Sequence, residues 1–349
     1  MNTIFLTGGG TAGHIAPNIA LLPYLRGYEV HYFGEAGSME ERMISAYPQI
    51  TFHALPCIKF HRSLSPKNIK IPFVLASGIS KAKKFIKELK PKAVFSKGGY
   101  AALPMAMAAY KKKVPLIIHE SDISMGLSNR LVAKKSRYVC TSFPSLAEKF
   151  DNGFFTGTPI RRELYEGNAE AVNRKLGFKK NGRPNLLIFG GSQGALAINQ
   201  AAEGAIKELC AYFNVLHIAG KHKFDGSHEN YRRLEFCDYM ADCYAWADYA
   251  VTRAGAGTLS EITALKIPSL VIPLPKSDSS RGDQVQNAAY YKDLGVIEVM
   301  EQDSLSCGSI VSETVALISK RQNLISAMNA NPGSDGTRKI AELLNSFNV

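Results

Sequence analysis

Short apolar runs recur along the chain, and segments long enough for helices separate them. Such runs, bounded by glycine or polar residues, are typical of buried strands, and their alternation with helices predicts a parallel sheet covered on both faces. The predicted strands are Thr3–Thr7, Val30–Phe33, Thr51–Leu55, Ala93–Phe95, Leu116–Ile118, Tyr138–Thr141, Asn185–Phe189, Val215–Ile218, Tyr249–Thr252 and Ser269–Pro273. The predicted helices are Pro17–Arg26, Ile79–Lys90, Ile198–Tyr212 and Thr337–Phe347.

The pattern restarts at Asn185, where a strand again runs directly into a glycine-rich loop. A length of 349 residues also favours two domains, at about 150 residues each. We therefore predict an α/β fold of two doubly wound domains, residues 1–160 and 161–332, followed by a C-terminal helical segment, residues 333–349. The polar segment Gly167–Pro184 is either a linker or an early crossover of the second domain.

The charge is distributed unevenly. The chain has 42 Lys and Arg against 30 Asp and Glu, a net charge of +12. Residues 1–158 hold 21 basic and 9 acidic residues, which is the whole excess, because the rest of the chain holds 21 of each. This asymmetry predicts that the first domain meets a polyanion or an anionic membrane.

A membrane surface is the better of these two partners. No basic motif interleaved with aromatic residues supports nucleic acid. An apolar stretch that includes Ile71, Phe73 and Leu75 lies within the lysine-rich segment from Lys67 to Lys90, a composition that suits an anionic bilayer surface. No apolar run reaches the roughly 18 residues of a membrane-spanning helix.

The sequence predicts neither a metal nor a bound cofactor. The six cysteines form no C-x-x-C pair, so we expect free thiols in a reducing cytosol and no zinc site. No Asp-x-Asp pair occurs, so a metal-bridged diphosphate is not indicated. A leaving diphosphate would instead require helix N-termini and a cation, for which Arg161 at the expected domain junction is the candidate.

A glycine fingerprint, Gly8-x-Gly10-x-x-Gly13, follows the first strand. Glycines let the backbone approach a phosphate, and the helix that follows presents unpaired N–H groups. Glu35 ends the second strand, where a dinucleotide enzyme holds a ribose. An NAD-dependent oxidoreductase is therefore one interpretation.

Two more glycine loops point to a different chemistry. Gly190–Gly194 opens the second half, and its Ser192 and Gln193 can add side-chain hydrogen bonds around a phosphate. Lys97-Gly98-Gly99-Tyr100 follows another strand of the first half. Glycine loops on both domains indicate a donor on one and an acceptor on the other.

Several polar residues adjoin these loops. His14 follows Gly13 at a helix N-terminus, where the helix dipole favours the neutral imidazole that a general base requires; the alternative is a residue that only caps or packs. Glu261 is placed to accept hydrogen bonds from ribose hydroxyls or to stabilise a helix N-terminus. Gln284 and Asn287 share a helix face, which suits sugar hydroxyls or a solvated surface.

Nine motifs occur together in one order over most of the chain. They are Gly9–His14 with Pro17, Lys97–Tyr100, His119-Glu120, Gly126–Asn129, Gly157–Arg161, Gly190–Ala195, Tyr244–Asp248, Ser260–Ile262 and Asp283–Ala288. In this order the sequence resembles the MurG family, the UDP-N-acetylglucosamine (UDP-GlcNAc) transferases that complete the lipid intermediate of the bacterial cell wall.

The resemblance implies a GT-B fold, two Rossmann-like domains with an intervening cleft, and a C-terminal helix that returns to the first domain. It implies an inverting transfer of N-acetylglucosamine from UDP-GlcNAc to the 4-hydroxyl of the muramic sugar of lipid I, which gives lipid II. It also implies a peripheral protein on the cytoplasmic side of the cell membrane. The N-terminal domain is then the acceptor and membrane domain, and the C-terminal domain holds UDP-GlcNAc.

By position in the motifs, His14 matches the family's candidate base, and Gly98, Gly99 and Tyr100 belong to the acceptor region. The family binds uracil largely through backbone near Cys237. The full set that matches donor-contacting positions is Thr11, Ala12, Gly13, Arg161, Ser192, Gln193, Cys237, Ala256, Gly257, Thr258, Glu261 and Gln284.

The chain also departs from the family. Ser121-Asp122 stands where many members have Gln-Asn, so Asp122 either changes a contact or shares the work of the base with His14. Ala12 replaces a common Gly, and Gly257 replaces a common Leu. The remaining alternatives are another GT-B lipid glycosyltransferase, a non-hydrolysing UDP-GlcNAc epimerase, a non-catalytic nucleotide-sugar binding protein and the NAD oxidoreductase.

Overall fold

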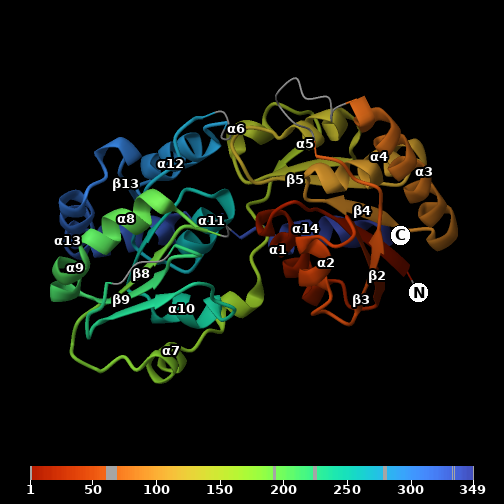
Figure 1. Cartoon of the computed structure of the whole chain (residues 1–349). Coiled ribbons are helices and arrows are strands. Elements are labelled where there is room, and N and C mark those ends of the chain that lie inside the picture. The colour runs from red at the N-terminus through yellow and green to blue at the C-terminus, as the bar shows by residue number, and fades with distance from the viewer. Residues whose placement is uncertain are drawn as a thin grey trace. The chain divides into compact units, whose positions relative to one another are not determined.

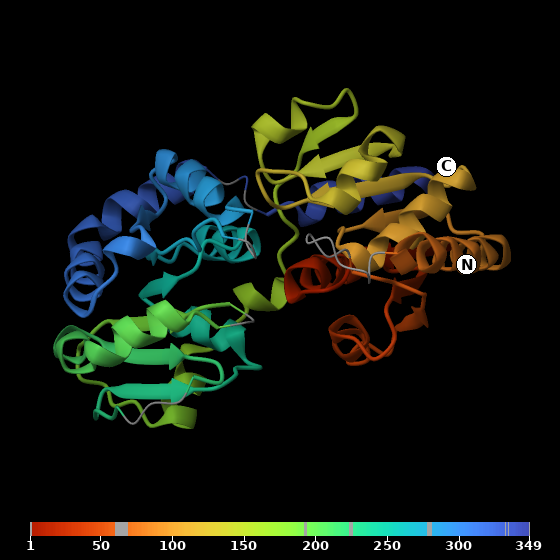
Figure 2. The same ribbon diagram turned by 45° about the horizontal axis from the view of Figure 1, so that its top comes forward.

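The computed structural model describes residues 2–59, 69–191, 194–222, 226–277, 281–331, 333 and 335–348. The chain divides into two compact units, which are shown in Figures 1 and 2. The N-terminal unit contains Met1–Arg161 together with Asp335–Val349, and the C-terminal unit contains Arg162–Ser334. Each unit is built on a fully parallel sheet, so the predicted fold of two doubly wound, Rossmann-like domains is confirmed.

The described part of the N-terminal unit contains a seven-stranded sheet in the order β3-β2-β1-β4-β5-β6-β7. The order reverses between β1 and β4, and Thr7 pairs with Ser96 where these strands end. The loops that follow them therefore emerge side by side at the switch point, where doubly wound sheets bind ligands. The strands are β1 (Asn2–Thr7), β2 (Tyr28–Gly34), β3 (Ile50–Ala54), β4 (Ala93–Ser96), β5 (Leu116–Glu120), β6 (Tyr138–Thr141) and β7 (Gly153–Phe155).

Two groups of helices cover this sheet. Helices α1 (Ala12–Leu21), α2 (Met39–Ile44) and α14 (Thr337–Asn345) share one apolar core with it. The Phe33 ring points away from that core and meets Phe85 of α3 (Ile71–Leu89) at a centroid distance of 5.3 Å. Helix α3 packs against α4 (Leu103–Lys111), which also contacts α5 (Leu127–Val132), and α6 (Pro144–Ala147) lies against β6 and β7.

Helix α14 comes last in the sequence but belongs to the N-terminal unit, where Figure 1 shows it next to α1. The Ile160 N–H donates to Thr337 Oγ1 (2.8 Å), and the Tyr28 hydroxyl donates to Asn345 Oδ1 (2.9 Å). Ile340 and Leu344 of α14 are buried in the core that α1 shares with the sheet. The chain thus returns to complete a core that it began with β1.

The C-terminal unit contains a six-stranded sheet in the order β10-β9-β8-β11-β12-β13. Its strands are β8 (Asn185–Phe189), β9 (Asn214–Ile218), β10 (Tyr231–Leu234), β11 (Tyr249–Thr252), β12 (Ser269–Val271) and β13 (Glu298–Val299). Its α-helices are α7 (Ala169–Leu176), α8 (Leu196–Gly204), α9 (Ile206–Tyr212), α10 (Met240–Trp246), α11 (Ala256–Ala264), α12 (Asp283–Asp293) and α13 (Cys307–Ala330). Helix α13 packs against α8, α9 and β12, and α10 packs against α7 and β8.

Several predicted boundaries were wrong. The helix predicted over Ile198–Tyr212 is two helices, because the backbone leaves the α conformation at Ala205 (φ −111°, ψ 12°). Helix α3 begins at Ile71 and not at Ile79, with Pro72 in its first turn, where a fixed φ favours helix initiation. The segment predicted as a linker or crossover contains α7. The short strands β7, β10 and β13 were not predicted.

Candidate functional site

The glycine loops that follow β1 and β4 lie against each other in the N-terminal unit. The Gly9 N–H donates to the Gly98 carbonyl (3.4 Å), and a Cβ on Gly99 would collide with the Gly9 carbonyl. Gly98 and Gly99 have φ values of +87° and +83°, a region that favours glycine. This approach of two backbones explains why both loops are rich in glycine.

Buried polar side chains hold the first loop in shape. Glu40, which is 1% exposed, accepts the Gly10 N–H at Oε2 (3.3 Å) and the Glu35 N–H at Oε1 (3.2 Å). The Tyr32 hydroxyl donates to the Gly8 carbonyl (2.6 Å). Sequence reasoning missed these supports, because nothing in the motif indicates that a glutamate thirty positions later folds under the loop.

His14 lies in the first turn of α1, next to the second loop. Its Nδ1 is 3.1 Å from Thr11 Oγ1, and a Cβ on Gly99 would be 3.3 Å from the same nitrogen. If Nδ1–H donates to Thr11, the imidazole is in the tautomer whose Nε2 is unprotonated, the form that a general base requires. The structure therefore brings together the predicted residues Thr11, Gly13, His14, Gly98 and Gly99, although their roles remain predictions.

Tyr100 covers the first glycine loop. Its hydroxyl donates to Glu35 Oε2 (2.5 Å), and a Cβ on Gly10 would lie 2.9 Å from its ring. Burial raises the pKa of the Tyr100 hydroxyl, and the hydrogen bond to Glu35 raises it further. The carboxylate that an NAD enzyme would offer to a ribose is thus engaged, and Tyr100 fills the space next to Gly10. This arrangement argues against the NAD interpretation.

A buried carboxylate organises the segment that follows β5. Glu120 Oε2 accepts the Gly126 N–H (2.9 Å) and the Asn129 Nδ2–H (3.1 Å), and Oε1 accepts the Asp122 N–H (3.2 Å). Asn129 Nδ2 also donates to the His119 carbonyl (2.9 Å). These bonds fix the backbone of Asp122, the candidate second base, relative to the end of β5.

Lys97 and His119 complete this polar cluster. Lys97 is only 2% exposed, and burial lowers its pKa against the opposing effects of Glu120 and Asp122. His119 Nε2 is hydrogen-bonded to the Gly157 carbonyl (2.8 Å). Burial lowers the pKa of His119 well below its usual value, and the charge of Lys97 lowers it further, so the imidazole is neutral. The motifs contained both residues, but sequence reasoning gave neither of them a role.

The same cluster contains side-chain atoms that find no hydrogen-bond partner within the described ranges: His119 Nδ1, Ser121 Oγ and Asn129 Oδ1. Buried polar atoms in folded proteins are nearly always satisfied by protein, water or ligand. Their grouping at the carboxyl end of β5 therefore suits the binding of a polar molecule.

In the C-terminal unit, the N-terminus of α11 is open. Gly255 is its N-cap without a side-chain hydrogen bond, and a Cβ built on Gly257 would meet no described atom within 4 Å outside its neighbours and its own helix backbone. The first-turn N–H groups of Ala256, Gly257 and Thr258 thus receive no side-chain cap, and uncapped helix N-termini are typical phosphate-binding sites. Glu261, one turn later, accepts the Tyr244 hydroxyl at Oε2 (2.8 Å).

Gln284 and Asn287 share a face of α12 but differ in solvent exposure. Gln284 is partly exposed, and its Oε1 accepts the Leu274 N–H (2.9 Å), which leaves its amide N–H₂ for another contact. Asn287 is completely buried, so the alternative of a solvated amide face is wrong for this residue. Cys237 Sγ lies 3.4 Å from Cys243 Sγ, a pairing that the sequence did not indicate.

The predicted donor set also includes Arg161, Ser192 and Gln193. Arg161 is the last residue of the N-terminal unit, and its buried Nε has no hydrogen-bond partner in the described part of the chain. Ser192 and Gln193 lie outside the described residues. No group of three side chains suited to metal binding occurs among the residues that were described.

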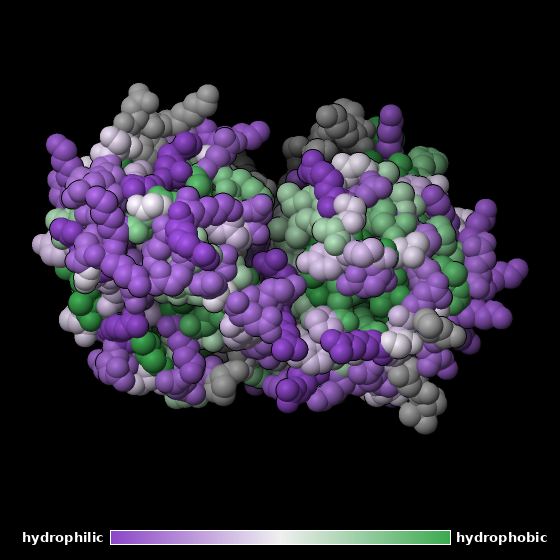
Figure 3. All heavy atoms as spheres, turned by 90° about the horizontal axis from the view of Figure 1, so that it is seen from below, coloured by the Kyte–Doolittle hydropathy of each residue, from purple (hydrophilic) through white to green (hydrophobic). Residues whose placement is uncertain are grey.

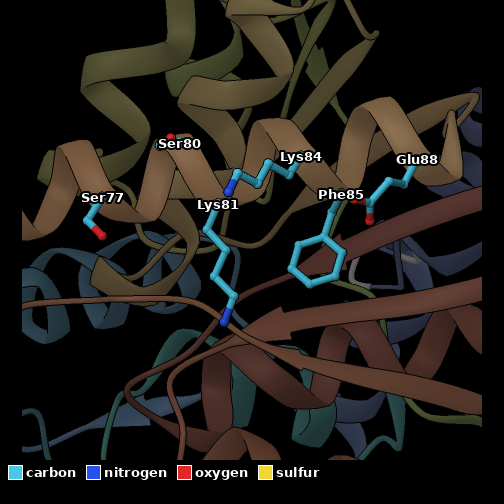
Figure 4. A pocket seen from close by; sticks show the side chains of 6 residues that line it. All are labelled: Ser77, Ser80, Lys81, Lys84, Phe85 and Glu88. Carbon is cyan, nitrogen blue, oxygen red and sulfur yellow. The ribbon is translucent and has the colours of Figure 1, made fainter.

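Helix α3 carries the predicted membrane residues. Ile71 and Leu75 are half-buried, whereas Phe73 is 75% exposed. Further along, two lysines and a phenylalanine help to line a shallow pocket on α3, which is drawn in Figure 4. Its lining residues are Ser77, Ser80, Lys81, Lys84, Phe85 and Glu88.

The opposite side of α3 is the apolar stripe that packs on the protein, formed by Gly78, Ile79, Ala82 and Ile86. Lys67 lies outside the described residues. Among the helices that are described, none is long and apolar enough to cross a membrane. Hydrophilic side chains dominate the face of the molecule in Figure 3, with hydrophobic residues gathered in smaller areas.

Comparisons with known proteins cover nearly the whole chain. Residues 4–141 match the glycosyltransferase family 28 N-terminal domain, and residues 185–344 match the C-terminal domain of that family. The UDP-N-acetylglucosamine–N-acetylmuramyl-(pentapeptide) pyrophosphoryl-undecaprenol N-acetylglucosamine transferases of Clostridium botulinum (strain Hall) and Lachnoclostridium phytofermentans are each 39% identical to this chain. The alignments cover 99% of this chain and 99% and 98% of those proteins.

Solved structures show the same fold. Acinetobacter baumannii MurG matches with a TM-score of 0.73 and 23% identity, over 99% of this chain and 100% of that one. UDP-GlcNAc 2-epimerase from Neisseria meningitidis, bound to UDP-GlcNAc, matches with a TM-score of 0.69 and 16% identity, over all of both chains.

Proposed function

The chain belongs to the MurG family of N-acetylglucosamine transferases, and from this membership we propose its activity and the roles of its residues. The protein is a glycosyltransferase that moves N-acetylglucosamine from UDP-GlcNAc to the 4-hydroxyl of the muramic sugar of lipid I. The product is lipid II, a precursor of peptidoglycan. The 39% identity over 99% of the chain to transferases supports this activity over the epimerase, which resembles the chain in fold.

The reaction requires a base on the acceptor side. The acceptor hydroxyl attacks C1 of the sugar from the face opposite UDP, the bond from C1 to the diphosphate oxygen breaks, and the hydroxyl proton passes to a base. We assign that base to His14, whose position beside Gly99 is the observation that carries the assignment. Thr11 would hold the imidazole tautomer that leaves Nε2 unprotonated. Asp122 remains the second candidate.

The donor is assigned to the C-terminal unit. The N–H groups of Ala256, Gly257 and Thr258 would face the diphosphate of UDP, and Glu261 would accept the ribose hydroxyls. Gln284 would offer its free amide N–H₂ to the sugar. Backbone near Cys237 would bind uracil, and Arg161 would offset charge on the departing diphosphate. No metal or cofactor is assigned a role.

Membrane attachment is assigned to α3. Exposed Phe73 would enter the interface between headgroups and acyl chains, and Lys81 and Lys84 would meet anionic headgroups. The undecaprenyl chain of lipid I cannot leave the bilayer, so the acceptor unit must reach the membrane surface. This assignment makes the protein peripheral, on the cytoplasmic side.

Calorimetry with UDP-GlcNAc, UDP-glucose and NAD tests the donor, and turnover with a lipid I analogue tests the reaction. We expect UDP-GlcNAc to bind most tightly and NAD not to bind. Tight binding of NAD without binding of UDP-GlcNAc would overturn the proposal. Formation of UDP-N-acetylmannosamine without transfer would identify an epimerase instead.

Co-sedimentation with phosphatidylglycerol vesicles tests the attachment. Phe73→Ser and Lys84→Ala should each weaken binding, by about 1 kcal/mol for the lysine, and binding should fall with added salt. The control is Lys207→Ala, because Lys207 is exposed on the C-terminal unit. Binding that ignores salt and both α3 variants would refute the assignment.

A further inference from the structure

Two cysteines of the C-terminal unit form a close pair of thiols. Cys237 lies in the loop between β10 and α10, and Cys243 lies within α10. Their Sγ atoms are 3.4 Å apart, whereas a disulfide requires about 2.0 Å, so small side-chain rotations would close the gap. Both residues are buried, although Cys237 retains 7% exposure and directly follows exposed Phe236. No other two thiols in the described ranges approach each other as closely.

The two thiols differ in acidity. The hydrogen bond from Cys243 lowers the pKa of Cys237, and the ammonium of Lys175 acts in the same direction. That bond, together with burial, raises the pKa of Cys243. Cys237 is also the thiol that keeps contact with solvent, whereas Cys243 is completely buried in α10. Because an oxidant must reach the thiolate that attacks it, Cys237 is the nucleophile of the pair and Cys243 is the thiol placed to resolve it.

We propose that Cys237 and Cys243 form a modification site, which hydroperoxides convert to an intrachain disulfide that weakens the binding of UDP-GlcNAc. The Cys237 thiolate attacks one peroxide oxygen, the O–O bond breaks, and a sulfenic acid and hydroxide result. Cys243 sulfur then attacks the sulfenic sulfur and displaces hydroxide, which leaves as water with the Cys243 proton. In total, two thiols and hydrogen peroxide give one disulfide and two waters, and the two sulfurs supply the two electrons.

The structure connects this pair to the donor site. Tyr244 follows Cys243 in α10, and its hydroxyl donates to Glu261, the residue assigned to ribose. The Tyr244 ring also meets Phe189, at the end of β8, with a centroid distance of 5.8 Å. A disulfide that draws the Cys237 loop onto α10 would shift both contacts. The effect on affinity rests on the proposed function, whereas formation of the disulfide does not.

The test uses the full-length protein in a Cys307→Ser background, because Cys307 is exposed and would react separately. Hydrogen peroxide followed by catalase should lower the number of titratable thiols in denaturant from five to three. Mass spectrometry should locate the cross-link at Cys237 and Cys243. Calorimetry should show UDP-GlcNAc affinity reduced by at least about fivefold, with recovery in dithiothreitol.

Added Cys243→Ser should abolish the loss of affinity, and Cys243→Ala replaces it if the serine variant does not fold. Added Cys210→Ser is the matched control, because Cys210 is also buried in this unit but has no thiol partner in the described part; it should behave like the background. Five thiols after peroxide would overturn the proposal, and a disulfide with unchanged affinity would overturn its link to the donor site. If the reduced protein does not bind UDP-GlcNAc, the proposed function fails, and the thiol count still decides whether the disulfide forms.

Discussion

Replacing Glu120 with glutamine tests the polar cluster at the end of β5. The substitution keeps the shape of the side chain but exchanges one carboxylate oxygen for an N–H₂ group. Both oxygens accept N–H bonds, from Gly126 and Asn129 on one side and from Asp122 on the other. In either orientation, the new N–H₂ group therefore faces a donor. The less costly orientation loses the bond from Asp122 and keeps the other two.

The magnitude follows from these bonds. A hydrogen bond to a charged group contributes about 1.5–3 kcal/mol, and the two that remain become weaker because their acceptor is neutral. We expect Glu120→Gln to lower the free energy of unfolding of the N-terminal unit by about 2–3 kcal/mol. The segment that carries Asp122 should also loosen, so the KM for a lipid I analogue should rise while UDP-GlcNAc binding stays unchanged.

The chain supplies an internal control for this measurement. Its only tryptophan, Trp246, lies in the C-terminal unit, so its fluorescence should follow that unit in urea and should not shift. Hydrogen exchange at residues 121–126 should accelerate. Glu148→Gln is the matched control, because Glu148 is exposed. Ordinary surface substitutions change the free energy of unfolding by less than about 0.5 kcal/mol. A change of that size in the N-terminal unit, with unchanged hydrogen exchange and an unchanged KM, would refute the role given to Glu120.

Three further predictions concern single side chains. His14→Ala should lower kcat by about 10²–10⁴-fold without affecting donor binding, and a smaller loss than that of Asp122→Asn would move the base to Asp122. Lys97→Met should lower the free energy of unfolding of the N-terminal unit by about 1.5–3 kcal/mol, because it removes the buried cation that interacts with Glu120; an unchanged free energy of unfolding would exclude that interaction. Burial lowers the pKa of His217 to about 3, so this residue stays neutral in the folded state while the unfolded chain takes up a proton below about pH 6.5. Stability of the C-terminal unit, followed by Trp246 fluorescence, should therefore fall by up to about 1.4 kcal/mol per pH unit from pH 6.5 towards 3, and His217→Gln should reduce that slope.

The sequence predicted most strands of both sheets because their apolar runs are long enough to be buried on both faces. It missed β10, whose Tyr-Arg-Arg-Leu pattern belongs to an edge strand, and β13, which has two residues. It also placed the start of α3 too late, because the exposed apolar residues around Phe73 do not follow the helical stripe.

For the candidate site, the glycine motifs predicted flexible loops at the ends of β1 and β4, but not that these two loops contact each other. They did not predict Glu40 beneath the first loop or the pairing of Cys237 with Cys243. Those contacts depend on where turns place side chains that carry no periodic signal. Asn287 is a different case. Helical spacing placed it on the same face of α12 as Gln284, but its burial depends on how α12 packs, which the spacing does not show.

The return of α14 to the N-terminal unit has a consequence for synthesis on the ribosome. Ile340 and Leu344 fill a core whose other walls are translated first, and the whole C-terminal unit is translated between them. The C-terminal unit can fold as soon as it emerges, but the N-terminal unit is completed only after α14 has left the tunnel. A nascent or truncated chain would therefore expose an unfinished acceptor core to chaperones and proteases, and premature termination would yield a folded donor unit without a working enzyme.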